Sequence, residues 1–136
     1  MIQILANWIG SFPGWQAENV DIGTLCQKTG SVGLFSRGIQ VLEEKTDILG
    51  NRTEFCRHSF ALRFRANAWT GFDTAVNFLH WVQTQNGQGL APRLGDMPLY
   101  SRIRTGACKA EGSDGTDTVT YAVELTADYI KQYEVK

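Results

Sequence analysis

The sequence predicts a single α+β domain over residues 1–136, in which two helices pack on an antiparallel sheet of about four strands. Two segments repeat apolar residues at helical spacing, whereas four others alternate apolar and polar residues as strands do. The strand-like segments come in two pairs, each joined by a turn signal. A chain of 136 residues has the usual length of one domain and buries enough surface for one core.

The first predicted element is a short amphipathic helix from Ile2 to Phe12, which ends before Pro13-Gly14. Its apolar face follows from three- and four-residue steps through Ile2, Leu5, Trp8, Ile9 and Phe12. The segment from Trp15 to about Arg37 contains several glycines and few periodic apolar residues. We expect a loop-rich connection there, with one short strand around Val20, and the least ordered part of an isolated subunit.

The middle of the chain predicts a hairpin of two strands, Gly38 to Ile48 and Arg52 to Arg65, joined at Leu49-Gly50-Asn51. The second of these strands alternates clearly, so its two faces can be separated. The apolar face holds Cys56, His58, Phe60, Leu62 and Phe64, and the opposite face holds Arg57, Ser59, Arg63 and Arg65.

The second half predicts a helix from Gly71 to Asn86, a strand from about Leu99 to Ala110 and a last strand from Asp117 to about Tyr133. Asp-Gly within residues 113–116 predicts the turn between the two strands. A broad apolar helix face should lie against the sheet. The expected core is Phe60, Leu62, Phe64, Phe72, Val76, Leu79, Val82, Val123 and Leu125.

The sequence contains no pattern that is typical of catalysis or of cofactor binding. His58 falls on the apolar face of its strand, where a hydrogen-bonded core histidine is the commoner outcome, and His80 falls on the polar side of its helix. The three cysteines are widely spaced and form neither a zinc motif nor a disulfide framework. We therefore expect no catalytic residue, cofactor or metal. No apolar stretch approaches membrane-spanning length, and no signal peptide is recognisable, so no membrane partner is expected either.

Arginines on two strand faces stand out from this background. If the strands that carry them share a sheet, they form a basic strip on its outward side, which has three interpretations. The strip is a solvated face with acidic neighbours such as Glu43, Glu54 or Glu124, a charged subunit interface, or a nucleic-acid contact. Because 14 acidic residues balance 13 basic ones, the net charge of −1 disfavours nucleic acid. The candidate interface residues are Arg57, Arg63, Arg65, Arg102 and Arg104, with Glu43, Glu44 and Asp47 as acidic partners on a neighbouring copy.

Two blocks of the chain resemble a known family. The segments Gly33 to Asn51 and Phe78 to Asp96, the latter with its Trp-Val-x-x-Gln core, resemble the small minor capsid proteins of long-tailed bacteriophages and prophages. The opening segment Asn7 to Gly14 and the closing strand that ends in Tyr133-Glu fit the same pattern. The positions that match most firmly are Trp81, Pro92, Gly95 and Asp96, and we interpret them as structural.

This family is similar in length and build to tail terminator proteins, and the resemblance implies a function in assembly. It implies a homo-oligomeric ring, a hexamer, at the tail end or head–tail joint of a virion built in the host cytoplasm. Its partners would be further copies of the chain and the phage tail-tube and head-completion proteins. No catalytic residues belong to such a family. The alternative is a small nucleic-acid-binding module that uses the arginine-rich strand faces.

Overall fold

The computed structural model describes residues 1–15, 19–26, 28–113 and 117–134. Its helices are α1 (Ile2–Gly10), α2 (Gly71–Gly87) and the short 3₁₀ helix η1 (Pro98–Tyr100). Its strands are β1 (Asp21–Ile22), β2 (Val32–Thr46), β3 (Arg52–Asn67), β4 (Arg102–Ser113) and β5 (Thr118–Tyr133). The predicted α+β class is therefore confirmed. The predicted turn at residues 113–116 lies mostly outside the described residues.

The sheet differs from the prediction in the number of its strands. Within the described ranges it has five strands in the order β1-β2-β3-β5-β4, and β1 pairs in parallel with β2. The sheet is therefore mixed, although every other pairing is antiparallel. The expectation of about four antiparallel strands is wrong, because the short strand expected around Val20 joins the sheet as Asp21–Ile22 and pairs in parallel.

Strand β2 begins six residues earlier than predicted, at Val32 rather than at Gly38. Val32 and Leu34 are completely buried, so this part of the expected loop is core. Gly38, which has a φ of +127°, lies at a bulge within one continuous strand and does not mark its beginning. The several glycines of this segment predict a loop, and the prediction of a loop through Arg37 is wrong for residues 32–37.

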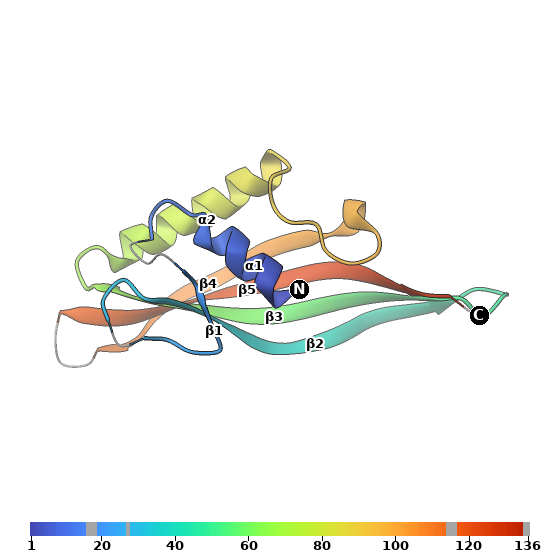
Figure 1. Cartoon of the computed structure of the whole chain (residues 1–136), viewed down its shortest axis with the longest axis horizontal. Coiled ribbons are helices and arrows are strands. Elements are labelled where there is room, and N and C mark those ends of the chain that lie inside the picture. Colours follow the sequence, from blue (N-terminus) through green and yellow to red (C-terminus); the bar gives the residue numbers. More distant parts are fainter. Residues whose placement is uncertain (16–18, 27, 114–116, 135–136) are drawn as a thin grey trace.

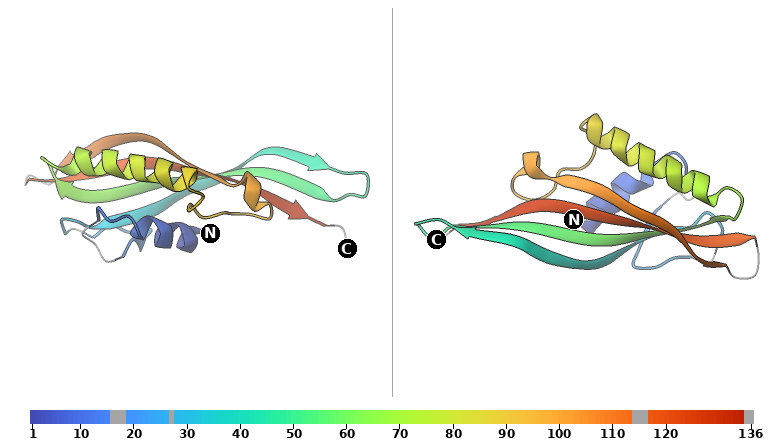
Figure 2. Two further views of the ribbon diagram at one scale, coloured as in Figure 1. Left: turned by 90° about the horizontal axis from the view of Figure 1, so that it is seen from above. Right: turned by 180° about the vertical axis from the view of Figure 1, so that it is seen from behind.

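Both α-helices lie on one face of the sheet (Figure 1), and the two further views show the same arrangement (Figure 2). Helix α1 buries the predicted face through Leu5, Trp8 and Ile9. Trp8 stacks on Trp81 of α2 with ring centroids 5.0 Å apart, and its Nε1 donates a hydrogen bond to Gln85 Oε1 at 3.0 Å. The helices are thus packed against each other as well as against the sheet.

Helix α2 buries only one side of the broad apolar face that the sequence predicts. It buries Ala75, Phe78 and Val82, whereas Phe72 and Val76 are about half exposed. The prediction that Phe72 and Val76 belong to the core is wrong, because contact with α1 turns Phe78 and Trp81 inward. Leu79 is partly buried at the margin. The remaining predicted core residues are buried as expected, namely Phe60, Leu62, Phe64, Val82, Val123 and Leu125.

The loop between α2 and η1 closes one edge of β5. Strand β4 pairs with β5 only as far as Asp128, and beyond that point Asp96 takes its place. The Asp96 amide donates to the Ile130 carbonyl at 2.8 Å, and the Asp96 carboxylate accepts from the Gln132 amide at 2.8 Å. Gly95 has a φ of +77°, and a Cβ there would lie 2.5 Å from the Ile130 carbonyl oxygen. This geometry explains structurally why glycine and aspartate occupy these two positions.

Candidate assembly surfaces

The far parts of β2 and β3 extend past both helices and form what we call the hairpin arm, residues 39–55 (Figure 1). Its turn is well determined, because the Asp47 carboxylate accepts hydrogen bonds from the amides of Leu49 and Asn51, both at 2.9 Å. Partial desolvation acts to raise the pKa of Asp47, but the hydrogen bonds from Asn51, Leu49 and Gly50 outweigh it and lower that pKa. The arm is therefore an ordered projection.

The hairpin arm exposes an unusual amount of apolar surface. Ile39 is 61% exposed, Leu49 is 75% exposed, and Ile48 is fully exposed at the tip. The exposed apolar side chains of the arm are Ile39, Val41, Leu42, Ile48 and Leu49. Single exposed apolar residues are normal, but a group of five on one projection is typical of a surface that contacts another protein.

The outer edge of β2 is also open along the arm. Strand β1 pairs with β2 only at Gly33 and Leu34, and beyond Leu34 the edge has no strand partner among the described residues. An open edge offers unpaired backbone amides and carbonyls to the strand of another chain. Two bulges, between Ser36 and Gly38 and between Val41 and Glu43, interrupt this edge and limit unspecific pairing.

The arginines predicted on β3 do lie on one face, opposite the helices, but they have partners within the chain. Arg57 binds Asp128 through two hydrogen bonds, of 2.8 and 3.0 Å, and these bonds raise the pKa of Arg57. Arg63 Nε donates to Glu111 Oε2 at 2.9 Å. Arg65 is buried, and its guanidinium lies 3.5 Å from Thr120 Oγ1. The β3 arginines are thus largely engaged in holding β3, β5 and β4 together.

Arg102 and Arg104 behave differently from the arginines of β3. They lie on β4, opposite Asp128 and Thr126 of β5, so they belong to the same sheet as predicted. Both are exposed, and neither forms an ion pair or a side-chain hydrogen bond with any residue that the structure describes. The predicted arginine strip is therefore divided into a paired group on β3 and an unpaired group on β4.

The acidic candidates all belong to the hairpin arm. Glu43 lies 3.7 Å from Lys45, and Glu44 lies 3.9 Å from Arg52, with all four side chains well exposed. Such long, exposed pairs contribute little to stability, so both carboxylates remain available to another partner. Asp47 is occupied by the turn. The structure thus leaves Glu43 and Glu44 as available acidic groups.

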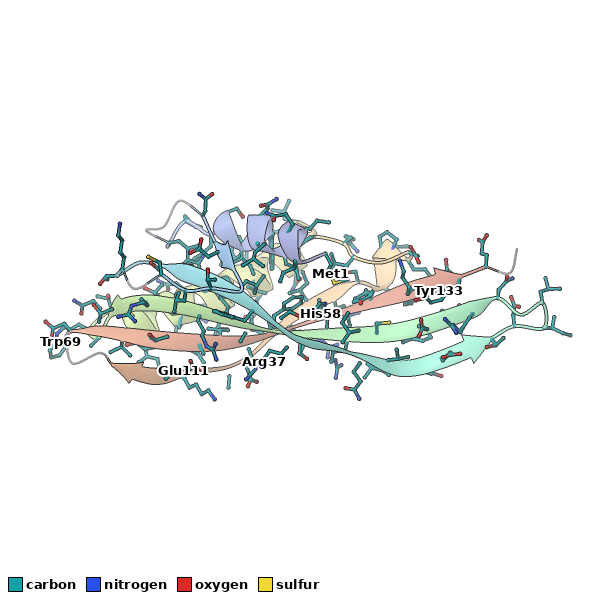
Figure 3. The ribbon with its side chains drawn as sticks, turned by 60° about the horizontal axis from the view of Figure 1, so that its bottom comes forward. Met1, Arg37, His58, Trp69, Glu111 and Tyr133 are labelled. Atoms are coloured by element: carbon teal, nitrogen blue, oxygen red, sulfur yellow. The ribbon has the colours of Figure 1, made fainter. Side chains whose placement is uncertain are left out.

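His58 was the only predicted residue with a possible chemical function inside the sheet. It is buried, stacks on Phe60, and lies 2.6 Å from Ser36 Oγ through Nε2; Figure 3 shows it near Met1. Burial, and secondarily the positive amino group of Met1, lower the pKa of His58. Its Nδ1 has no hydrogen-bond partner among the described residues, so no carboxylate orients the ring as a catalytic triad requires. We interpret His58 as a core histidine.

No group of three potential metal ligands occurs within the ranges that the structure describes. Over the same ranges, no helix is long and apolar enough to cross a membrane. No protein-family model matches the chain. No curated protein matches it either.

Proposed function

We propose that this protein is a structural virion subunit of a tailed phage or prophage, of the minor capsid or tail terminator type. It would form a homo-oligomeric ring, a hexamer, at the tail end or head–tail joint, and would assemble in the host cytoplasm with tail-tube and head-completion proteins. The observation that carries the assembly function is the hairpin arm, which projects from the helix-covered sheet and exposes five apolar side chains. The phage setting follows from the resemblance of the sequence blocks.

Several features support an assembly function. The covered part of the sheet has a complete core of its own, so the arm is not needed to build it. Apolar groups and an open strand edge in water are unfavourable and favour association, so they are expected to be covered in the working state. A contact between the arm and another surface of the next copy is heterologous, and such contacts close into rings when the rotation permits.

The nucleic-acid alternative has less support. Arg57 and Arg63 are neutralised by Asp128 and Glu111, and Arg65 is buried, so the β3 face offers few available cations to phosphate groups. The net charge of −1 adds no long-range attraction to nucleic acid. This arrangement favours a protein contact.

Size measurement combined with imaging tests the proposal. Light scattering on the purified full chain should give six times the mass of the 15.2-kDa chain, and negative-stain images should contain rings. Added tail-tube protein from the same phage or prophage should acquire rings at the ends of its tubes. A chain that stays monomeric at every concentration, with and without tail-tube protein, would overturn the proposal.

A further inference from the structure

Three arginines surround one pocket beside the outer edge of β4. The pocket has a volume of about 290 Å³, and Arg93, Arg102 and Arg104 are among its lining residues. Arg102 and Arg104 come from β4, whereas Arg93 comes from the loop that follows α2. None of the lining residues is an aspartate or a glutamate. We call this site the arginine pocket.

The neutral polar groups of the arginine pocket are used within the chain, whereas none of its three guanidinium groups forms an ion pair with a residue that the structure describes. Asn86 Nδ2 donates to the Ile103 carbonyl at 2.8 Å, and Ser101 Oγ accepts from the Leu94 amide at 2.9 Å. Arg93 Nη1 donates a long hydrogen bond to the Pro98 carbonyl at 3.4 Å. Three arginines therefore contribute to the lining of a pocket that contains no carboxylate.

The nearest acidic candidate within the chain is already bound. Asp128 lies opposite Arg102 in the register of β4 and β5, but both of its oxygens accept hydrogen bonds from Arg57. The carboxylates of Glu43 and Glu44 cannot replace it, because β5 and β3 separate β4 from β2. At about 4.8 Å per strand, the two outer strands lie roughly 14 Å apart. Neither Asp128 nor the Glu43-Glu44 pair of the same chain is therefore placed to neutralise the arginine pocket.

We infer that the arginine pocket binds the carboxylates of Glu43 and Glu44 on the hairpin arm of a second copy. This inference rests on the proposed self-assembly and identifies the two surfaces that meet. Guanidinium groups bind carboxylates through paired hydrogen bonds, and such contacts are among the strongest polar contacts in interfaces. Glu43 and Glu44 are exposed, and within their own chain they have only long contacts.

The two surfaces also match in their geometry. Glu43 and Glu44 are consecutive in β2 and pair with consecutive residues of β3, so they project from opposite faces of the arm. The arginine pocket lies at the outer edge of β4, and its arginines likewise come from both sides of the sheet. Arg102 and Arg104 belong to the sheet, and Arg93 follows the helix that covers the other face. An arm that enters this edge can therefore present one carboxylate to each side.

A charge exchange between two variants tests the inference. The variant R102E/R104E reverses the pocket, and the variant E43R/E44R reverses the arm. Each alone should bind to itself on the order of 100-fold more weakly or worse, because like charges would meet at every contact. Mixed in equal amounts, the two variants should assemble again, because the arm of each variant then meets a pocket of opposite charge on the other variant. Light scattering after size exclusion provides the measurement, and circular dichroism verifies that each variant is folded.

The matched control is K28E/K109E, which changes the net charge as much as R102E/R104E does but at two exposed residues that neither line the pocket nor belong to the arm. It should assemble like the unchanged chain. Assembly of R102E/R104E by itself, with the unchanged chain also assembling, would overturn the inference and leave the proposed function intact. A monomeric unchanged chain would overturn both. If R102E/R104E keeps its assembly but loses binding to double-stranded DNA, the pocket is a phosphate site and the inference is wrong.

Discussion

Strands β2 and β3 run through two regions of the molecule, the part beneath the helices and the hairpin arm. Both regions alternate apolar and polar residues, but they differ in how far the apolar side chains are buried. Beneath the helices, Val32, Leu34 and Leu62 are completely buried. Further along, on the hairpin arm, Ile39 and Val41 pair with His58 and Cys56 on the same face of the sheet, yet both are largely exposed. Alternation therefore identifies the apolar face of a strand but does not show whether another element covers it.

The charged residues of the two regions differ in the same way. In the covered part, Arg57 and Arg63 form hydrogen-bonded ion pairs of 2.8 and 2.9 Å. On the arm, the pairs of Glu43 and Glu44 with neighbouring cations are 3.7 and 3.9 Å long. These two arginines of the covered part are engaged within the chain, whereas Glu43 and Glu44 of the arm remain available. This contrast is what we expect if one region serves folding and the other serves association.

The largest effect should come from the helix that covers the sheet. Phe78→Ala removes a completely buried ring that contacts Phe12, Trp15 and Trp81, and should lower the free energy of unfolding by about 3–5 kcal/mol. Phe72→Ala is the matched control, because Phe72 is about half exposed and should lose only about 1 kcal/mol. Urea denaturation measures both. Equal losses would mean that the helix does not face the sheet through Phe78.

The sequence predicted the elements better than it predicted the faces of α2. The alternation of β3 was strong enough to separate its two faces, and those assignments are confirmed. Helix α2 offers two overlapping apolar stripes, one through Phe72 and Val76 and one through Ala75 and Phe78. Only the position of α1, with the stacking of Trp8 on Trp81, determines which stripe is buried. A contact between elements distant in the sequence is not visible in periodicity.

The candidate surfaces also depend on contacts between distant elements, which the sequence pattern does not show. The sequence placed Arg57 and Arg63 on one face, but their partners Asp128 and Glu111 depend on the register of β5 and β4, which no local pattern reveals. Arg93 was missed because its approach to β4 depends on the path of a loop. The apolar arm was missed too. The pair Ile48-Leu49 in a turn between strands was its one visible indication, since turns seldom carry exposed apolar residues without a partner.

A smaller effect is expected where the loop before η1 closes the edge of β5. Gly95→Ala should lower the free energy of unfolding by about 2–3 kcal/mol, since a Cβ would collide with the Ile130 carbonyl at a positive φ. Gly89→Ala serves as the control, because its φ is +71° but its nearest neighbour would be 3.9 Å away, and it should lose only about 1 kcal/mol. Hydrogen exchange at the Gln132 amide should accelerate only in Gly95→Ala. Unchanged exchange there would contradict the proposed closure.

The stability of the covered part should also depend on pH through His58. Its pKa in the folded state is lowered below the ordinary value of 6.5, mainly by burial, so the unfolded chain binds the proton more readily. The free energy of unfolding should therefore be highest above pH 6.5 and should fall as the pH decreases toward the folded-state pKa. His58→Asn should remove this slope between pH 7 and 5, as measured by urea denaturation across that range. A slope of the same size in the variant would assign it to other groups.

The smallest effect on folding should come from the tip of the arm. Ile48→Ser combined with Leu49→Ser should change the free energy of unfolding by no more than about 0.5 kcal/mol, because these side chains are exposed in the folded and unfolded states alike. The same double variant should weaken self-association, which light scattering over a dilution series detects. Val32→Ser provides the contrast, since it truncates a completely buried apolar side chain in the same hairpin and should mainly affect folding. A large loss of folding stability in the tip variant would show that the arm packs within its own chain, and the division between folding and association would then disappear.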